Sequence, residues 1–155
     1  MKLSNENSIN WNLRDLSSAL KISESAVLRF LRDGRNSAFL LKFRIANELN
    51  MSLVEGHNAP ANLIAANGEI WKIKTCTKIS GVSFCRNAMI GKGRKFNVSD
   101  FVEDLKDVTG FILCDLEGFP TVRIYKITSK DVQVLFNRGV IPEGRMKYSN
   151  FIAMT

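Results

Sequence analysis

The feature that most limits the fold of this 155-residue chain is an Asn-Gly pair at positions 67–68, directly followed by the run EIWKIKTCTK. Asn-Gly is a strong short-range signal for a hairpin, because both residues tolerate the positive φ angles of a type I′ turn. We therefore predict a hairpin whose strands cover residues 62–66 and 69–76. A sheet must then form at least part of the core.

The second strand of this hairpin has two different faces. Trp71 and Ile73 alternate with Lys72 and Lys74, so one face is apolar and the other carries two ammonium groups. Two like charges on one strand face repel each other unless an anion lies opposite them. The pattern predicts an anion-binding surface, and the alternative is a solvent-exposed edge strand whose lysines oppose aggregation.

The remaining C-terminal sequence predicts further strands and a helix between them. This order places the chain in the α/β (α+β) class, with a mixed sheet and flanking helices. The expected elements are strands at 111–116 and 121–127, a turn at 117–120, a helix at 99–108 capped by Ser99, a strand or helix at 131–136, and an irregular segment at 141–151.

Residues 13–50 show a helical pattern instead. An apolar face on residues 13–20 predicts a first helix, and Ser23 can cap a second helix that begins with the acid Glu24. A third helix is expected at about 37–50. The apolar residues at helical spacing in the second and third helices are Val27, Phe30, Leu31, Phe39, Leu40, Phe43, Ala46 and Leu49.

These helices resemble the helix-turn-helix of bacterial repressors. The resemblance lies in the spacing of the residues that would pack between the helices, which are Leu16, Ser17, Leu20, Ile22, Val27 and Phe30. One position departs from the pattern, because Lys21 occupies the turn where glycine is usual. The resemblance implies that the second helix enters a DNA major groove. The alternative is a three-helix bundle without a ligand.

Two sets of DNA contacts follow from this resemblance. Exposed residues near the start of the second helix would contact base edges, and residues just beyond it would contact phosphates. The base-readout set is Glu24, Ser25, Leu28 and Arg29, and the phosphate set is Arg32, Arg35 and Asn36.

Positive charge is concentrated beyond these helices. Residues 1–55 hold eight Lys/Arg and six Asp/Glu, for a net charge of +2. Residues 72–95 hold seven bases and no acid, so the net charge of this segment is +7. The whole chain has the same net charge. This segment predicts a polyanionic partner, double-stranded DNA, although a solvated loop can have the same composition. The predicted phosphate contacts are Lys72, Lys74, Lys78, Arg86, Lys92, Arg94 and Lys95.

The order hairpin, basic segment, helix, hairpin within residues 60–136 resembles the PD-(D/E)xK nuclease superfamily, especially PvuII-like restriction endonucleases. In that superfamily an aspartate on the first strand, and a glutamate two residues before a lysine on the second, hold the metal. An ungapped comparison places Lys74 on the lysine, Lys72 on the glutamate and Asn62 on the aspartate. Both metal-binding carboxylates are thus replaced, so the resemblance implies the fold without its catalytic metal.

An active enzyme would need acids from elsewhere in the chain. Glu55 precedes the hairpin and Asp115 lies on a later strand, so a relocated Mg²⁺ site would use these two beside Lys74 as the catalytic residue. Glu69 has the parity of Trp71 and is expected to face away from Lys74. We therefore expect no metal, no cofactor and no DNA cleavage, with Mg²⁺ required only by an endonuclease.

The composition excludes several other classes. Three cysteines without CxxC spacing and a single histidine do not suit a disulfide scaffold or a structural zinc site. No apolar run approaches the roughly 20 residues of a membrane span. The polar start does not fit a secretory signal. We expect a reduced, cytoplasmic, nucleoid-associated protein that does not bind membranes.

Together these patterns predict a sequence-specific DNA-binding protein, most simply a transcriptional regulator. Residues 1–55 are expected to form the helix-turn-helix module, and residues 56–155 a catalytically inactive nuclease-like domain. A homodimer is expected because one short recognition helix contacts few base pairs. The alternatives are a type II restriction-type endonuclease with relocated metal ligands and a protein–protein adaptor whose basic segment meets an acidic partner.

Overall fold

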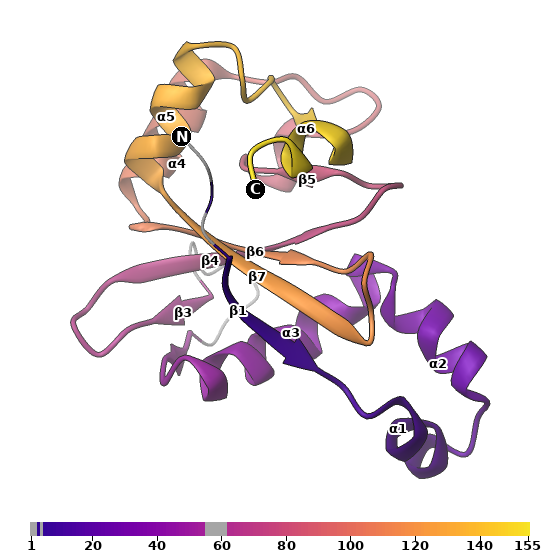
Figure 1. Cartoon of the computed structure of the whole chain (residues 1–155). Coiled ribbons are helices and arrows are strands. Elements are labelled where there is room, and N and C mark those ends of the chain that lie inside the picture. The colour runs from indigo at the N-terminus through magenta and orange to yellow at the C-terminus, as the bar shows by residue number, and fades with distance from the viewer. Residues whose placement is uncertain (1–2, 4, 55–61) are drawn as a thin grey trace.

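The fold is built on a mixed sheet. A computed structural model describes residues 3, 5–54 and 62–155, and these form a six-stranded and a two-stranded sheet (Figure 1). The strand order of the large sheet is β1-β7-β6-β4-β3-β2. Its strands are β1 (Asn5–Asn10), β2 (Ser52–Leu53), β3 (Leu63–Ile64), β4 (Ile70–Cys76), β6 (Gly110–Asp115) and β7 (Thr121–Thr128). The small sheet contains β5 (Val82–Ser83) and β8 (Arg145–Met146).

The central strands β4 and β6 are parallel, and the other neighbouring pairs of the large sheet are antiparallel within the described residues. A parallel pair needs a long crossover, which here includes the 3-10 helix η1 (Asn87–Met89) and α4 (Val98–Lys106). β6 and β7 then form the second predicted hairpin. The mixed α/β class expected from the sequence is confirmed.

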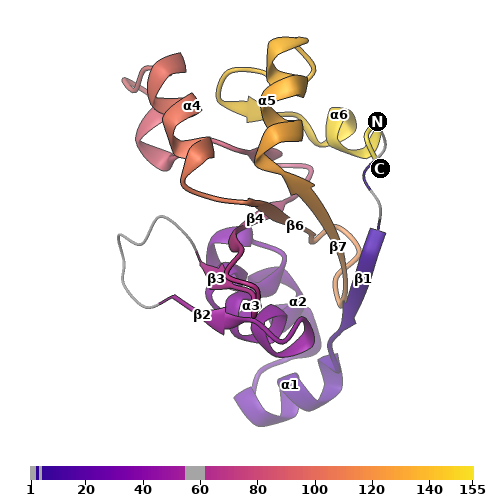
Figure 2. The same ribbon diagram turned by 90° about the vertical axis from the view of Figure 1, so that its left-hand side faces the viewer.

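Helices cover both faces of the large sheet (Figure 2). On one side lie α1 (Leu13–Leu20), α2 (Glu24–Leu31) and α3 (Gly34–Glu48). On the other lie α4, α5 (Ser129–Asn137) and α6 (Tyr148–Ile152). α3 packs on β4 and begins with a glycine for a steric reason, because a Cβ at Gly34 would collide with the side chain of Thr75.

Two hydrophobic cores form on the two sides of the sheet. The core beneath α3 includes Leu41 and Ile45 of that helix, together with Trp71 and Ile112 of the strands. The core toward α4 and α5 includes Phe101, Leu105, Phe111, Leu113, Tyr125, Val132 and Leu135. Alternate residues of each central strand thus enter opposite cores, as period-two packing requires.

The hairpin predicted at Asn67-Gly68 is present, but its turn type is not the predicted one. β3 and β4 are antiparallel, with Leu63 opposite Trp71. Gly68 has a φ of 84°, whereas the φ of Asn67 is not positive. A type I′ turn needs positive φ at both central residues, so the type I′ prediction is wrong. Only the glycine supplies the left-handed conformation of this turn.

Several predicted boundaries also differ. Asn97, and not Ser99, caps α4, because its Oδ1 accepts a hydrogen bond from the backbone N–H of Asp100. α3 starts at Gly34 with Asp33 as its N-cap, three residues before its predicted start. Both errors have the same cause. Several neighbouring residues could cap each helix, and the sequence alone does not show which of them does.

Residues 131–136, expected as a strand or a helix, are helical within α5. Two other stretches differ from the sequence expectations. The segment expected to be irregular, 141–151, contains β8 and most of α6. No expected strand covers β1, whose polar residues form an edge strand paired with β7. Tertiary pairing and not local pattern stabilises these short elements.

Both predicted units contribute to the large sheet. Residues 1–55 supply β1 and β2, and residues 56–155 supply the other four strands. The three N-terminal helices are found at the predicted places, with Ser23 as the N-cap of α2. Among the described residues, no helix is long and apolar enough to cross a membrane.

Candidate functional site

Lys72 and Lys74 lie on the sheet face that α4 and α5 cover. Their neighbours in the alternation, Ile70 and Cys76, belong to the core on that side. Trp71 belongs to the opposite core, beneath α3. The prediction that both lysines share one strand face, opposite Trp71, is confirmed.

Lys74 is held by the protein backbone. Its Nζ donates a hydrogen bond of 3.0 Å to the carbonyl oxygen of Cys85. Burial lowers the pKa of Lys74 to about 8, the positive charges of Lys72 and Arg145 add to this effect, and Cys85 and Asp104 oppose it. The ammonium is therefore mostly charged at pH 7 and loses its proton in mildly alkaline solution.

Neither lysine takes part in an ion pair with any described carboxylate. Asp104 acts on Lys74 electrostatically, but its carboxylate accepts two hydrogen bonds of 2.8 Å from Arg86. Glu55, one acid of the relocated metal site, lies outside the described residues. Two ammonium groups therefore share a partly buried face where the nearby acid already has a cationic partner.

The positions that hold metal in the nuclease superfamily carry other groups here. Asn62 Oδ1 accepts a hydrogen bond of 2.8 Å from the backbone N–H of Ile73, so its side chain belongs to the hairpin. Glu69 accepts a hydrogen bond from the indole N–H of Trp71, which agrees with the expectation that it faces away from Lys74. Within residues 3, 5–54 and 62–155, no group of three His, Cys, Asp or Glu could hold a metal ion.

Asp115, the second acid of the relocated metal site, is completely buried. Its carboxylate accepts hydrogen bonds from Arg123 at 2.8 Å, from the Tyr148 hydroxyl at 3.1 and 3.2 Å, and from the backbone N–H of Glu117 at 3.1 Å. Burial and the charge of Asp115 raise the pKa of Tyr148 to about 12. Asp115 therefore joins β6, β7 and α6, and its oxygens already have donors.

Acids from outside the basic segment 72–95 compensate two of its bases. Arg86 pairs with Asp104 of α4 at 2.8 Å. Lys78 Nζ lies 3.9 Å from the carboxylate of Glu117. The absence of acids within a sequence window does not prevent such pairing, because the partners come from other elements.

The other end of the segment keeps its charge exposed. Lys92 and Lys95 are solvent-exposed. Arg94 Nη1 donates to the carbonyl oxygens of Asn87 and Ile90, at 2.6 and 3.1 Å. Since neutral carbonyls accept these bonds, Arg94 orders the loop and remains a net positive charge beside the two lysines.

The helices α1 and α2 are joined by a turn of three residues, 21–23. Lys21 adopts a left-handed conformation with φ 54° and ψ 40°. Ser17 Oγ donates to the carbonyl of Ile22, and Ser23 Oγ accepts from the backbone N–H of Ala26. For a residue with a Cβ the left-handed conformation costs roughly 1–2 kcal/mol, which is why glycine is usual at such a position.

The predicted base-readout set is mostly exposed. Glu24, Ser25 and Arg29 face solvent. Leu28 instead packs partly buried against the core beneath α3, so its predicted exposure is wrong. Phe30 differs in the opposite sense, because its side chain, predicted to be in the core, is 54% exposed.

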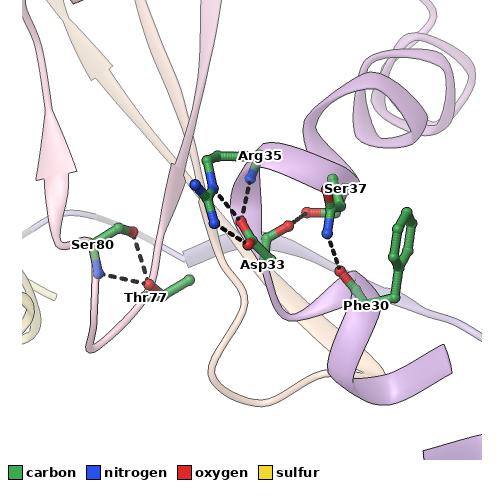
Figure 3. A network of polar contacts seen from close by, with 7 residues as sticks. Phe30, Asp33, Arg35, Ser37, Thr77 and Ser80 are labelled. Carbon is green, nitrogen blue, oxygen red and sulfur yellow. Dashed lines mark hydrogen bonds and ion pairs between the residues drawn. The ribbon is translucent and has the colours of Figure 1, made fainter. Parts of the chain in front are cut away.

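The predicted phosphate contacts after α2 differ in their surroundings, and Figure 3 shows Arg35 beside Asp33. Arg35 donates to both carboxylate oxygens of Asp33, and these bonds lower the pKa of Asp33 to about 2. Asn36 Nδ2 donates to the carbonyl of Phe30 at 3.3 Å. Arg32 is exposed and forms no ion pair with a described acid.

Two contributors to the lysine site leave no signal in the sequence. Cys85 accepts the hydrogen bond of Lys74 through its backbone carbonyl, a group that every residue carries. Arg145 comes near Lys74 only because β8 pairs with β5. The three cysteines are free and buried, and burial raises the pKa of both Cys76 and Cys114 to about 12.

The sequence matches no protein-family model and no curated protein. What the site binds is therefore inferred from the residues of this chain and their geometry.

Proposed function

We propose that this protein binds double-stranded DNA sequence-specifically, as a transcriptional regulator that does not cut it. The observation that carries the proposal is the pair of ammonium groups on β4, Lys72 and Lys74, which share a face and have no ion-pair partner among the described acids. A DNA phosphate supplies the anion that two such charges favour. The net charge of +7 also attracts a polyanion.

The surroundings of β4 support an inactive nuclease-like site. The hairpin β3–β4, the basic segment, α4 and the hairpin β6–β7 follow one another in the order on which the resemblance to PD-(D/E)xK nucleases rests. Lys74 would take the place of the catalytic lysine, and Lys72 and Asn62 the places of the carboxylates. An ammonium and an amide bound to the backbone do not suit a divalent cation, so the site would hold a phosphate without hydrolysing it.

The turn between α1 and α2 supports the helix-turn-helix part of the proposal, although Leu20, Ile22 and Phe30, which the motif would pack, are 57%, 46% and 54% exposed. Lys21 has the conformation that glycine favours at this place in the motif. The exposed Arg29 and Arg32 project from α2 and its end, where base and phosphate contacts are proposed. Arg35 is a weaker candidate than Arg32 because Asp33 already neutralises it.

Three parts of the proposal concern the partner, the cofactor and the location. We propose a homodimer, because two copies of α2 would contact a two-fold DNA site of twice the length. No metal or cofactor is proposed. A location on the bacterial nucleoid, in the cytoplasm, would follow from the DNA-binding role.

The test combines binding and cleavage in one experiment. The full-length protein is mixed with a mixed-sequence duplex library, with and without Mg²⁺ or Mn²⁺, and both gel shift and nicking are scored. We expect shifted DNA, no nicking, and enrichment of a subset of sequences after repeated selection. Metal-dependent cleavage would favour the endonuclease with relocated ligands. Absence of any shift at low salt would contradict the proposal.

A further inference from the structure

The exposed apolar side chains of this protein are concentrated on its N-terminal helices. Six of the large hydrophobic residues with substantial exposure lie between residues 20 and 43. They are Leu20, Ile22, Phe30, Phe39, Leu40 and Phe43. α1 has no buried residue, and it extends away from the sheet in Figure 2. Residues that the sequence assigns to a core are thus left without cover.

The middle of α3 carries the densest part of this surface. Leu41 and Ile45 are buried against the sheet, at 1% and 0% exposure. On the outward side Phe39, Leu40 and Phe43 are 65%, 42% and 46% exposed. Phe39 and Phe43 are one helical turn apart, and their rings meet edge to face with centroids 5.0 Å apart. Two aromatic rings in contact with each other therefore face outward, with Leu40 next to Phe39 in the sequence.

Phe30, near the end of α2, adds a fourth exposed apolar side chain. Its side chain projects beside the first turn of α3, near Ser37, in Figure 3, and its carbonyl accepts the hydrogen bond from Asn36. We define the α3 patch as Phe30, Phe39, Leu40 and Phe43. Their exposed fractions add to about two complete side chains, which is on the order of 400 Å² at roughly 200 Å² for each large side chain.

This area is close to the apolar share of a standard dimer interface. A standard interface buries about 800 Å² on each partner, of which a little more than half is apolar. The α3 patch alone supplies nearly that apolar share. Within the patch Phe39 and Phe43 are in contact, and contiguous apolar patches on a monomer commonly mark an interaction site.

The charges around the patch favour a second copy of the same chain over a nucleic acid. Arg35 is neutralised by Asp33, and Arg44 pairs with Glu48 at 2.8 Å, so neither guanidinium is free for a phosphate. Two copies that each carry a net charge of +7 repel each other unless they meet through a surface with little net charge. The side chains of the α3 patch carry no charge themselves, and Arg32 and Lys42 are the bases beside it in the sequence that form no ion pair with a described acid. The patch lies on the opposite side of the sheet from Lys72 and Lys74.

We propose that two copies of this chain associate through the α3 patch, with α3 packed against its symmetry mate across a two-fold axis. A two-fold contact is self-complementary, so Phe39 and Phe43 of one copy would meet those of the other. This inference rests on the proposed homodimer, but it does not require that the ligand be DNA. It does not involve the sheet face of either copy that carries Lys72 and Lys74.

Sedimentation equilibrium of the full-length protein over a range of concentrations is the first test. We expect a reversible dimer for the wild-type chain. The double variant Phe39→Ser/Phe43→Ser should raise the dissociation constant at least about a hundredfold, because each buried aromatic at the centre of an interface contributes about 2 kcal/mol or more. Val134→Ser on α5, where Val134 is 40% exposed, is the matched control and should leave the dimer unchanged.

Cross-linking supplies an independent measurement. The native cysteines are free and buried, so they give little background. Under mild oxidation Phe43→Cys should give a covalent dimer on a non-reducing gel, and Val134→Cys should not. Circular dichroism of each variant excludes misfolding, which is not expected at exposed positions.

The outcomes separate this inference from the proposed function. A wild-type chain that stays monomeric, or a double variant that still dimerises, would overturn the α3 interface. A dimer that depends on Phe39 and Phe43 but does not shift DNA would support the interface and contradict the DNA-binding proposal.

Discussion

The two faces of the large sheet share the same strands but are covered in opposite ways. Toward α4 and α5 the covering helix buries its aromatic ring, with Phe101 only 1% exposed, and the strand β4 contributes Lys72 and Lys74. Toward α3 the strands are mainly apolar, and the covering helix leaves Phe39 65% exposed. The face toward α4 and α5 thus encloses charged side chains, whereas the helix on the other face leaves apolar side chains exposed to solvent.

This difference shows that a charged side chain can be partly buried and an aromatic side chain exposed in the same fold. The charged face costs stability because Lys74 is partly desolvated, as its lowered pKa indicates. The aromatic face loses stabilisation because its rings remain in water. Both costs are consistent with groups that are retained for binding: an anion on one side and a protein partner on the other.

The largest expected effect separates the two covering helices by stability. Phe101→Ala should lower the free energy of unfolding by about 3–5 kcal/mol, because it leaves a cavity in the core. Phe39→Ala should change it by less than about 0.5 kcal/mol, as expected for an exposed side chain. Urea denaturation at a concentration where the chain is monomeric measures both. Equal losses would mean that α3 is as buried as α4.

The polar network on the charged face is next in size. Asp115→Ala should lower the free energy of unfolding by about 2 kcal/mol. This loss is smaller than for a fully buried ion pair, because the Arg123 side chain is 46% exposed. Tyr148→Phe removes one donor and should cost about 1 kcal/mol. The same denaturation experiment measures both variants. If Asp115→Ala left the free energy of unfolding unchanged, Arg123 and Tyr148 would have found other partners, and Asp115 would not join the strands to α6.

The lowered pKa of Lys74 predicts that stability and DNA affinity depend on pH in opposite directions. Its pKa is lowered from 10.5 to about 8, so between these pH values the unfolded chain binds more protons than the folded chain. The free energy of unfolding should therefore rise with pH in this window, and Lys74→Met should lack that rise. DNA affinity should fall over the same window, by up to about tenfold if one charged hydrogen bond is lost.

The Lys74→Met variant is the control for both pH dependences. At each pH, urea denaturation measures the free energy of unfolding and fluorescence anisotropy measures the DNA affinity. Parallel pH curves for wild type and Lys74→Met, in both measurements, would show that this ammonium titrates normally and does not contact the ligand.

The smallest expected effect distinguishes base readout from phosphate contact. Arg29→Ala should reduce discrimination between DNA sequences by about 1 kcal/mol, whereas Lys92→Ala should weaken all sequences equally. Competition binding with the selected site and a scrambled site measures this difference. An equal loss on both DNAs for Arg29→Ala would exclude α2 from base readout.

Much of the lysine site could be predicted because its signal is local. Alternation places Lys72 and Lys74 on one face whatever the strand packs against, and Ser23 caps a helix through atoms of its own turn. The mixed α/β class follows in the same way from the order of strand and helix patterns.

What could not be predicted depends on contacts between distant segments. Period and polarity do not indicate that Cys85 offers its carbonyl to Lys74, or that Asp104 neutralises Arg86. Helical spacing marks Phe39 and Phe43 as apolar, but which side of α3 meets the sheet is decided by Leu41 and Ile45 on the opposite side. α3 carries apolar residues on more than one side, so its sequence alone does not indicate which side packs on the sheet.

The most direct test of the central claim is the salt dependence of DNA affinity for the wild-type chain and for Lys72→Ala. With about five phosphate contacts, the logarithm of the wild-type association constant should fall against the logarithm of salt concentration with a slope near −4 to −5. Lys72→Ala should weaken binding and make the slope shallower by about 1. An unchanged slope and affinity for Lys72→Ala, or a flat wild-type response, would contradict a DNA phosphate at the lysine face of β4.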